Sequence, residues 1–224
     1  MRVVLTREAG MNDSLRWLLP PESQVVEVPL THTKYLGDES ILEQVQSVVG
    51  MKTVAITSAR SVRALSGPLR DFSHLPIYCV GEATAKSLRE SGIEPAWVGT
   101  NGAAELANEI PSGPVLFVGA KENREELAEA LARRTIELHS VSSYETLPVE
   151  LTEGEIVEIG SADVLFIGAP SAWSVAEQFV GEKTVIVAKG ETTAQVVKVS
   201  HPETIVGWGS ETKEILAELA KSNN

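Results

Sequence analysis

Short apolar runs alternate with amphipathic stretches along nearly the whole chain. Residues 164–167 (Val-Leu-Phe-Ile) are apolar at every position, which is typical of a strand in a parallel sheet covered on both faces. Between such runs, apolar residues recur at three- and four-residue spacing, as in Val62/Leu65 and Leu127/Leu131, and this period predicts helices. The alternation predicts an α/β fold. The expected strands are 3–6, 25–29, 53–57, 77–80, 96–98, 115–118, 136–140, 164–167, 184–188 and 204–206.

The chain also repeats itself. Residues 56–62 (Ile-Thr-Ser-Ala-Arg-Ser-Val) resemble 167–175 (Ile-Gly-Ala-Pro-Ser-Ala-Trp-Ser-Val), and 80–85 resemble 188–194. The strand pair near the N-terminus has its counterpart after the first repeated unit, so one copy is circularly permuted and inserted whole into the other. We therefore predict two similar five-stranded, flavodoxin-like parallel sheets in two lobes joined by a two-segment hinge. The predicted lobes are 1–31 with 149–224, and 37–141, with crossings at 32–36 and 142–148.

Composition narrows the classes of partner and compartment. The formal net charge of −12 argues against nucleic acid and anionic membranes as partners. The single cysteine, Cys79, excludes an intrachain disulfide. The chain enters its first expected strand within three residues, which predicts no signal peptide, and no apolar run approaches the roughly 20 residues that span a bilayer. We expect a cytoplasmic protein, and a monomer, because both faces of each sheet are already covered.

Candidate binding residues follow from the fold class. Ligands of an open parallel sheet bind outside the carboxyl ends of its strands, near the point where the strand order reverses. Cations and hydroxyls at such ends suit an anionic ligand, although the hydroxyls also suit helix capping. The candidates are Arg7, Ser58, Thr84, Lys121, Ser171 and Thr193, with Arg60, Arg124 and Lys189 as weaker ones. Glu125, Glu126 and Glu129 are expected to form a solvated helix face.

Six motifs in order along the chain resemble the uroporphyrinogen-III synthase family. They are 5–7 (Leu-Thr-Arg), 57–62 (Thr-Ser-Ala-Arg-Ser-Val), 80–85 (Val-Gly-Glu-Ala-Thr-Ala), 123–127 (Asn-Arg-Glu-Glu-Leu), 144–146 (Tyr-Glu-Thr) and 190–194 (Gly-Glu-Thr-Thr-Ala). Each motif alone is weak, but six in sequence within a nested duplication form a strong signal that covers essentially the whole chain. The departures are Glu82 and Glu191, where the family varies, and two serines before Tyr144, where an aliphatic residue is more usual.

The resemblance implies a two-lobed enzyme of tetrapyrrole biosynthesis that needs no cofactor and no metal. Its substrate would be linear hydroxymethylbilane, an octacarboxylate that is cyclised with inversion of ring D and loss of water through a spiro-pyrrolenine intermediate. The bilane alone cyclises without inversion, so the enzyme must mainly impose a conformation. The family pattern places a tyrosine on the second crossing, facing the cleft, and Tyr144 occupies that position. Tyr144 would donate a hydrogen bond to the departing hydroxyl; the alternative is an aromatic residue that packs the hinge.

Two other classes of function compete with this interpretation. A non-catalytic two-lobed binding protein for a small anionic ligand would use the same loops. A nucleotide-dependent enzyme is disfavoured because no Gly-x-Gly-x-x-Gly or Walker loop follows any strand. Analysis of the porphyrin isomers formed from the bilane distinguishes the synthase from both alternatives.

Overall fold

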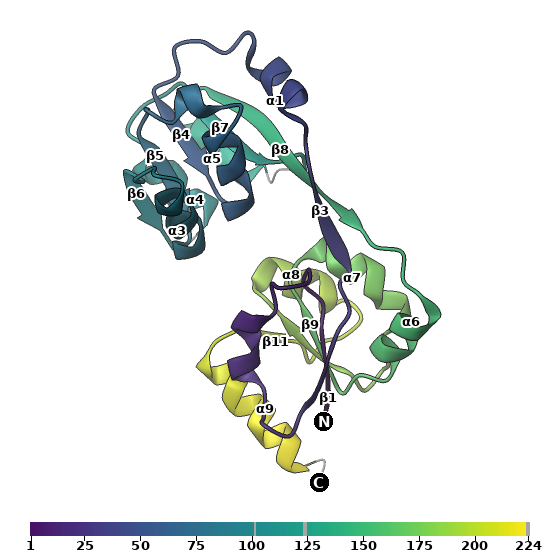
Figure 1. Cartoon of the computed structure of the whole chain (residues 1–224). Helices are drawn as coiled ribbons and strands as arrows, with labels where there is room; N and C mark the ends of the chain where they lie inside the picture. The colour runs from purple at the N-terminus through teal and green to yellow at the C-terminus, as the bar shows by residue number, and fades with distance from the viewer. Residues whose placement is uncertain (101, 123–124, 223–224) are drawn as a thin grey trace. The chain divides into compact units, whose positions relative to one another are not determined.

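The structure is a computed structural model that describes residues 1–100, 102–122 and 125–222. The chain divides into two compact units. Met1–His32 and Leu147–Asn224 form the first, which we call the outer unit because its segments flank the other in the sequence; Thr33–Thr146 form the inner unit. The chain therefore passes from one unit to the other twice, and each unit has its own sheet (Figure 1).

The outer unit contains a five-stranded sheet in the order β11-β10-β9-β1-β2, and its neighbouring strands are parallel. This order reverses beside β1, as in the predicted flavodoxin-like arrangement. The elements are β1 (Arg2–Leu5), η1 (Asp13–Leu18), β2 (Gln24–Glu27), α6 (Glu153–Gly160), β9 (Val164–Ile167), α7 (Pro170–Ala176), η4 (Glu177–Phe179), β10 (Val185–Ala188), α8 (Glu191–Val197), β11 (Ile205–Val206) and α9 (Ser210–Ser222).

The inner sheet has the order β3-β8-β7-β4-β5-β6, and its strands from β8 to β6 are parallel. The order β8-β7-β4-β5-β6 repeats that of the outer sheet. The elements are β3 (Thr31–Tyr35), α1 (Asp38–Val45), β4 (Thr53–Ile56), η2 (Ala59–Ser61), α2 (Val62–Ser66), η3 (Arg70–Phe72), β5 (Ile77–Val80), α3 (Glu82–Glu90), β6 (Trp97–Gly99), α4 (Ala103–Glu109), β7 (Val115–Ala120), α5 (Glu126–Arg133) and β8 (Leu138–Pro148).

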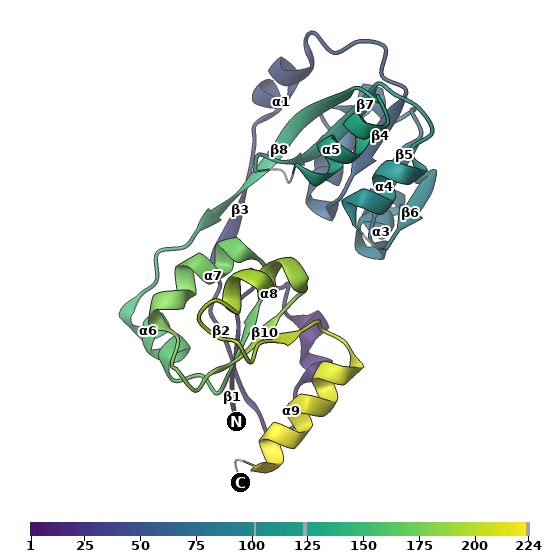
Figure 2. The same cartoon turned by 180° about the vertical axis from the view of Figure 1, so that it is seen from behind.

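Successive residues of each strand face opposite sides of its sheet, and both sides are covered. In the outer unit, Val4 and Leu165 pack with α6, α7 and α8, whereas Leu5 and Phe166 pack with η1 and α9. Figures 1 and 2 show α9 on the other side of this sheet from α6 and α7. In the inner unit, α1, α2 and α3 cover one face and α4 and α5 cover the other. Burial on both faces explains why the strand sequences are almost continuously apolar.

The predicted α/β fold with two parallel sheets is confirmed, with one correction to the strand count. The inner sheet has six strands, because β3 lies beside β8, and β8 continues to Pro148 through the segment predicted as a crossing. Hydrogen bonds explain the extension: the N–H of Leu36 donates to the carbonyl of Ser143 at 3.0 Å, and the Ser143 hydroxyl donates to the carbonyl of Gly119 at 3.1 Å. The side chains of this segment are mostly polar, so the hydrophobic pattern did not predict the strand.

Candidate active site

A cavity of about 340 Å³ opens at the carboxyl edge of the inner sheet. Three lining residues mark this edge: Thr57 follows β4, Val80 ends β5 and Ala120 ends β7. This is the edge at which a doubly wound sheet binds its ligands. The other lining residues are Gly102, Ala103, Phe117, Glu122, Glu126, Leu127 and Tyr144.

Tyr144 reaches this cavity from β8. Its side chain lies mostly within the protein, and the residue is 7% exposed. The guanidinium carbon of Arg60 lies 5.8 Å from the centre of its ring, in a cation–π contact. The phenol hydroxyl makes no hydrogen bond with any of the described residues; the main-chain carbonyl of Tyr144 accepts from the main-chain N–H of Lys121. The residue is buried, but its hydroxyl oxygen is not among the buried unpartnered atoms, so it is accessible and available to a ligand in the cavity.

Lys121 lies next to the cavity and is held by a carboxylate. Its ammonium group is 3.4 Å from one oxygen of Glu145, and Lys34 is 3.0 Å from the other. The hydrogen bond from Lys34, supported by Lys121, lowers the pKa of Glu145 below its ordinary value. The main-chain N–H of Lys121 also donates to the carbonyl of Tyr144 at 2.7 Å. Because Lys121 remains 62% exposed, it can still reach an anion in solvent.

The hydroxyl-bearing candidates lie at helix N-termini. Ser58 caps η2, since its hydroxyl accepts a hydrogen bond from the N–H of Arg60 at 3.3 Å. Thr84 and Thr193 are each 4% exposed in the first turns of α3 and α8. Ser171 lies in the first turn of α7 and is partly buried. Capping therefore accounts for Ser58, and none of the four lines the inner cavity.

The carboxyl edge of the outer sheet gathers two cations over one indole ring. The Arg7 guanidinium, after β1, lies 5.7 Å from the ring centre of Trp208, and the Lys189 ammonium, after β10, lies 5.9 Å from it. Gly168, after β9, lies against this arrangement: a Cβ placed there would be 3.6 Å from Trp208 and 3.8 Å from Arg7, in ordinary van der Waals contact. An indole face with two cations suits an anionic ligand that carries a planar ring.

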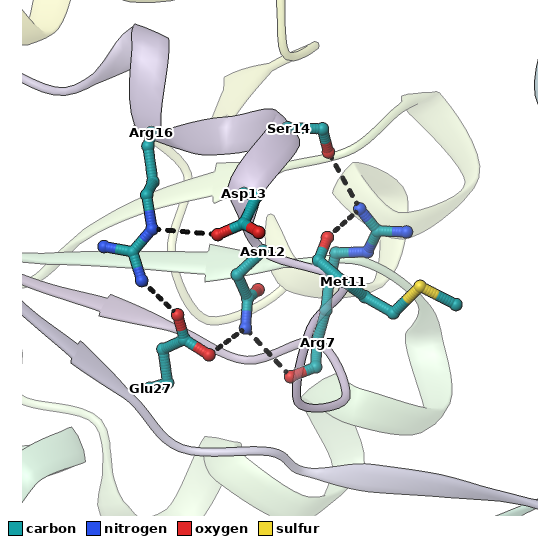
Figure 3. A network of polar contacts seen from close by, with 7 residues as sticks. All are labelled: Arg7, Met11, Asn12, Asp13, Ser14, Arg16 and Glu27. Carbon is teal, nitrogen blue, oxygen red and sulfur yellow. Dashed lines mark hydrogen bonds and ion pairs between the residues drawn. The ribbon is translucent and has the colours of Figure 1, made fainter.

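A polar network fixes the loop that carries Arg7 (Figure 3). The Arg7 guanidinium donates to the carbonyl of Met11 at 2.6 Å and to the hydroxyl of Ser14 at 3.2 Å. The side-chain amide of Asn12, which is fully buried, donates to the carbonyl of Arg7 at 3.2 Å and to the carboxylate of Glu27 at 3.0 Å. Arg16 binds the other oxygen of Glu27. The loop is thus tied to β2, which gives Arg7 a defined position.

The sequence prediction missed three side chains at these two edges. Trp208 lies under the cations of the outer edge, and Glu122 and Glu126 line the inner cavity. Glu126 is exposed, as the expected solvated helix face requires, but it also lines the cavity, whereas Glu129 is exposed and pairs with Arg133 at 3.8 Å. The strand before Trp208 has only two residues, so the sequence offered no clear signal for the position of this indole. Asn123 and Arg124 lie outside the described residues.

No helix within 1–100, 102–122 and 125–222 is long and apolar enough to cross a bilayer. Within the same ranges, no three His, Cys, Asp or Glu side chains are grouped in a way that could hold a metal ion.

Comparisons with known proteins agree with one another. The family model described as uroporphyrinogen-III synthase HemD matches residues 22–206. No curated protein matches. Among solved structures, uroporphyrinogen-III synthetase from Helicobacter pylori is 20% identical with a TM-score of 0.66, and each chain is covered over 100% of its length. A mutant uroporphyrinogen III synthase from the extremely thermophilic bacterium Thermus thermophilus is 17% identical with a TM-score of 0.65, covering 100% of this chain and 98% of that chain.

The two solved structures share the fold of this chain, and the family model covers most of its length. The chain therefore belongs to the uroporphyrinogen-III synthase family and is an enzyme that cyclises a linear tetrapyrrole to uroporphyrinogen III.

Proposed function

We propose that Tyr144 is the general acid of this cyclisation. The observation that supports it is a phenol that is 7% exposed, lines a cavity and has no hydrogen-bond partner among the described residues. When the terminal hydroxyl of hydroxymethylbilane leaves, it takes the electron pair of the C–O bond and needs a proton to become water. The Tyr144 hydroxyl can hydrogen-bond this oxygen and supply the proton.

The substrate's carboxylates bind to the polar residues at the carboxyl edge of each sheet. Arg7 offers a planar, bidentate partner for a carboxylate, and Lys121 offers a point charge. The helix N-termini at Ser58, Thr84, Ser171 and Thr193 add N–H groups and hydroxyls that suit the same anions. These contacts fix the conformation of the linear octacarboxylate, and conformation decides whether ring D inverts.

The lobe boundaries proposed from the repeat are 1–31 with 149–224, and 37–141. We further propose that the enzyme acts as a cytoplasmic monomer without a cofactor. Sedimentation equilibrium at micromolar concentration tests the monomer directly.

The decisive experiment supplies the protein with freshly generated hydroxymethylbilane, oxidises the products and separates the porphyrin isomers. Dominance of the type III isomer over the spontaneous type I supports catalysis with inversion. Type I alone, from folded protein and active substrate, would leave only a binding role. The same assay then measures each variant below.

A further inference from the structure

The inner cavity has a charge that does not suit carboxylates. Among the described residues that line it, two are glutamates and none is lysine or arginine. Apolar side chains of Val80, Phe117 and Leu127 form much of the remaining wall. A carboxylate placed among two glutamates and these apolar groups would be repelled and poorly solvated. An octacarboxylate substrate must therefore place some other part of itself in this cavity.

The two duplicated sheets differ in charge at equivalent positions. Ala188 pairs with Ile167 in the outer sheet as Cys79 pairs with Ile56 in the inner sheet, so the register places Lys189 where Val80 stands. Leu5 pairs with Phe166, and Phe117 pairs with Ala55. Arg7 thus corresponds to Gly119.

At the positions that the register aligns, the outer edge carries cations and the inner edge does not. Lys121 and Arg60 lie at other positions of the inner edge, paired with Glu145 and stacked on Tyr144 respectively, and neither lines the cavity. At the inner edge, the equivalent cations are absent, and the chain instead brings Glu126 from the first turn of α5 and Glu122 from the loop after β7. Glutamates in place of cations would weaken the binding of a carboxylate. A site where positive charge develops gains from this exchange, because carboxylates placed beside a developing cation stabilise it.

The reaction itself supplies such a charge. When the hydroxyl leaves with the C–O electron pair and gains a proton to become water, the pyrrole that carried it becomes an azafulvene cation, whose charge is shared by the ring nitrogen. Attack by a pyrrole carbon on the exocyclic carbon forms the new C–C bond and moves the positive charge to the attacking ring, which loses its N–H proton to give the neutral spiro-pyrrolenine. Fragmentation of this intermediate forms an azafulvene cation again, and reclosure followed by loss of a proton restores aromaticity. Because the departing oxygen is bonded to the carbon next to the ring that first becomes cationic, the cation forms beside the acid that protonates that oxygen.

We propose that Glu126 and Glu122 are catalytic residues that stabilise the azafulvene cation in the inner cavity beside Tyr144. The inference rests on the proposed role of Tyr144, which fixes the departing hydroxyl at this cavity. The ring being ionised enters the inner cavity with its carboxylate side chains directed away from the two glutamates.

Neutral, isosteric variants test this proposal. Glu126→Gln should lower kcat about tenfold, and E122Q/E126Q about a hundredfold, because only the cationic transition state gains from the charges. KM should stay the same or fall, since repulsion of the substrate's carboxylates is also removed. Glu126→Asp, which restores the charge, should recover most of the lost kcat. Both side chains are on exposed residues, so the thermal midpoint should not change.

Glu129→Gln is the matched control, because Glu129 lies on the same helix outside the cavity and should behave as wild type. A kcat within twofold of wild type in E122Q/E126Q would overturn the inference, as would an equal loss in Glu126→Asp. A loss expressed only as a higher KM would do the same. If the wild type forms no type III isomer, the proposed function fails instead, so the two failures are separable.

Discussion

The Tyr144→Phe substitution separates a chemical role of the hydroxyl from a packing role of the ring. The hydroxyl has no protein partner among the described residues, so its removal leaves no buried group unpaired. The ring and its contact with Arg60 at 5.8 Å are retained. The free energy of unfolding should therefore change by less than about 0.5 kcal/mol. By contrast, kcat should fall about 10- to 100-fold, at the low end of general acid catalysis, since a phenol is a weak acid and the pyrrole nitrogen assists departure.

Activity alone would not identify the cause, so three measurements are combined. Urea unfolding gives the stability, initial rates give kcat and KM, and isomer separation gives the type III fraction. Positioning survives the substitution, so the enzymatic product remains type III, while spontaneous type I accumulates as the enzyme slows. Tyr144→Ala should also lose about 3 kcal/mol of stability, because it empties a largely buried ring site.

Tyr78→Phe is the control, because Tyr78 lies on the same sheet, stacked on Trp97 with ring centres 6.2 Å apart, and does not line the cavity. It should leave kcat unchanged. If Tyr144→Phe also turned over within twofold of wild type, the acid assignment would be refuted. If instead it lost more than about 1 kcal/mol of stability, the hydroxyl would have an unrecognised structural partner.

Three further predictions concern the framework around the site, each read from chemical or thermal unfolding. Arg134→Ala should cost about 1.5–3 kcal/mol, and Arg134→Lys should recover only part, because the guanidinium donates to three carbonyls at the end of α4; an unchanged urea midpoint would contradict this. Gly99→Ala should cost about 1–3 kcal/mol, because the new Cβ would clash with the Trp97 indole, and wild-type stability would show that the indole moves freely. Thr152→Ala should cost about 1 kcal/mol at pH 7 by opening the capping box with Glu155. Hydrogen bonds from the Thr152 main chain and side chain lower the Glu155 pKa below 4.5, so this cost should persist above that pH and shrink as pH falls through the lowered pKa.

Most of the fold could be predicted from the sequence because strands that are buried on both faces are apolar at almost every position. Residues 164–167 cannot be amphipathic, since helices cover both sides of the sheet to which they belong. The sixth inner strand could not be found this way. β3 contains the polar residues His32 and Lys34, and it forms a strand because it lies beside β8 in the sheet. A strand that is polar on most positions has no hydrophobic period to detect.

The candidate site could be predicted only where backbone position decides it. Arg7 lies two residues after β1 and Ser58 two residues after β4, so topology alone brings them to a carboxyl edge. The place of Glu126 at the cavity depends on where its side chain points from the first turn of α5. Successive residues of a helix are rotated by about 100° about its axis, so a one-residue error in the predicted helix start moves a side chain from the cavity to solvent. Trp208 follows a two-residue strand, which is too short to fix its register from sequence.

The placement of charge matters more here than its total. The chain carries a formal net charge of −12, yet its proposed substrate is a polyanion. At physiological ionic strength the Debye length is about 8 Å, so exposed glutamates farther away contribute little repulsion. Arg7 and Lys189 lie 5.7 and 5.9 Å from the centre of one indole ring, where a bound carboxylate would meet them directly. The same reasoning applies in reverse to the inner cavity, whose two glutamates act only on what enters it. In each unit of this duplicated fold, the charges at the sheet edge thus decide which group binds there, without a change in overall charge.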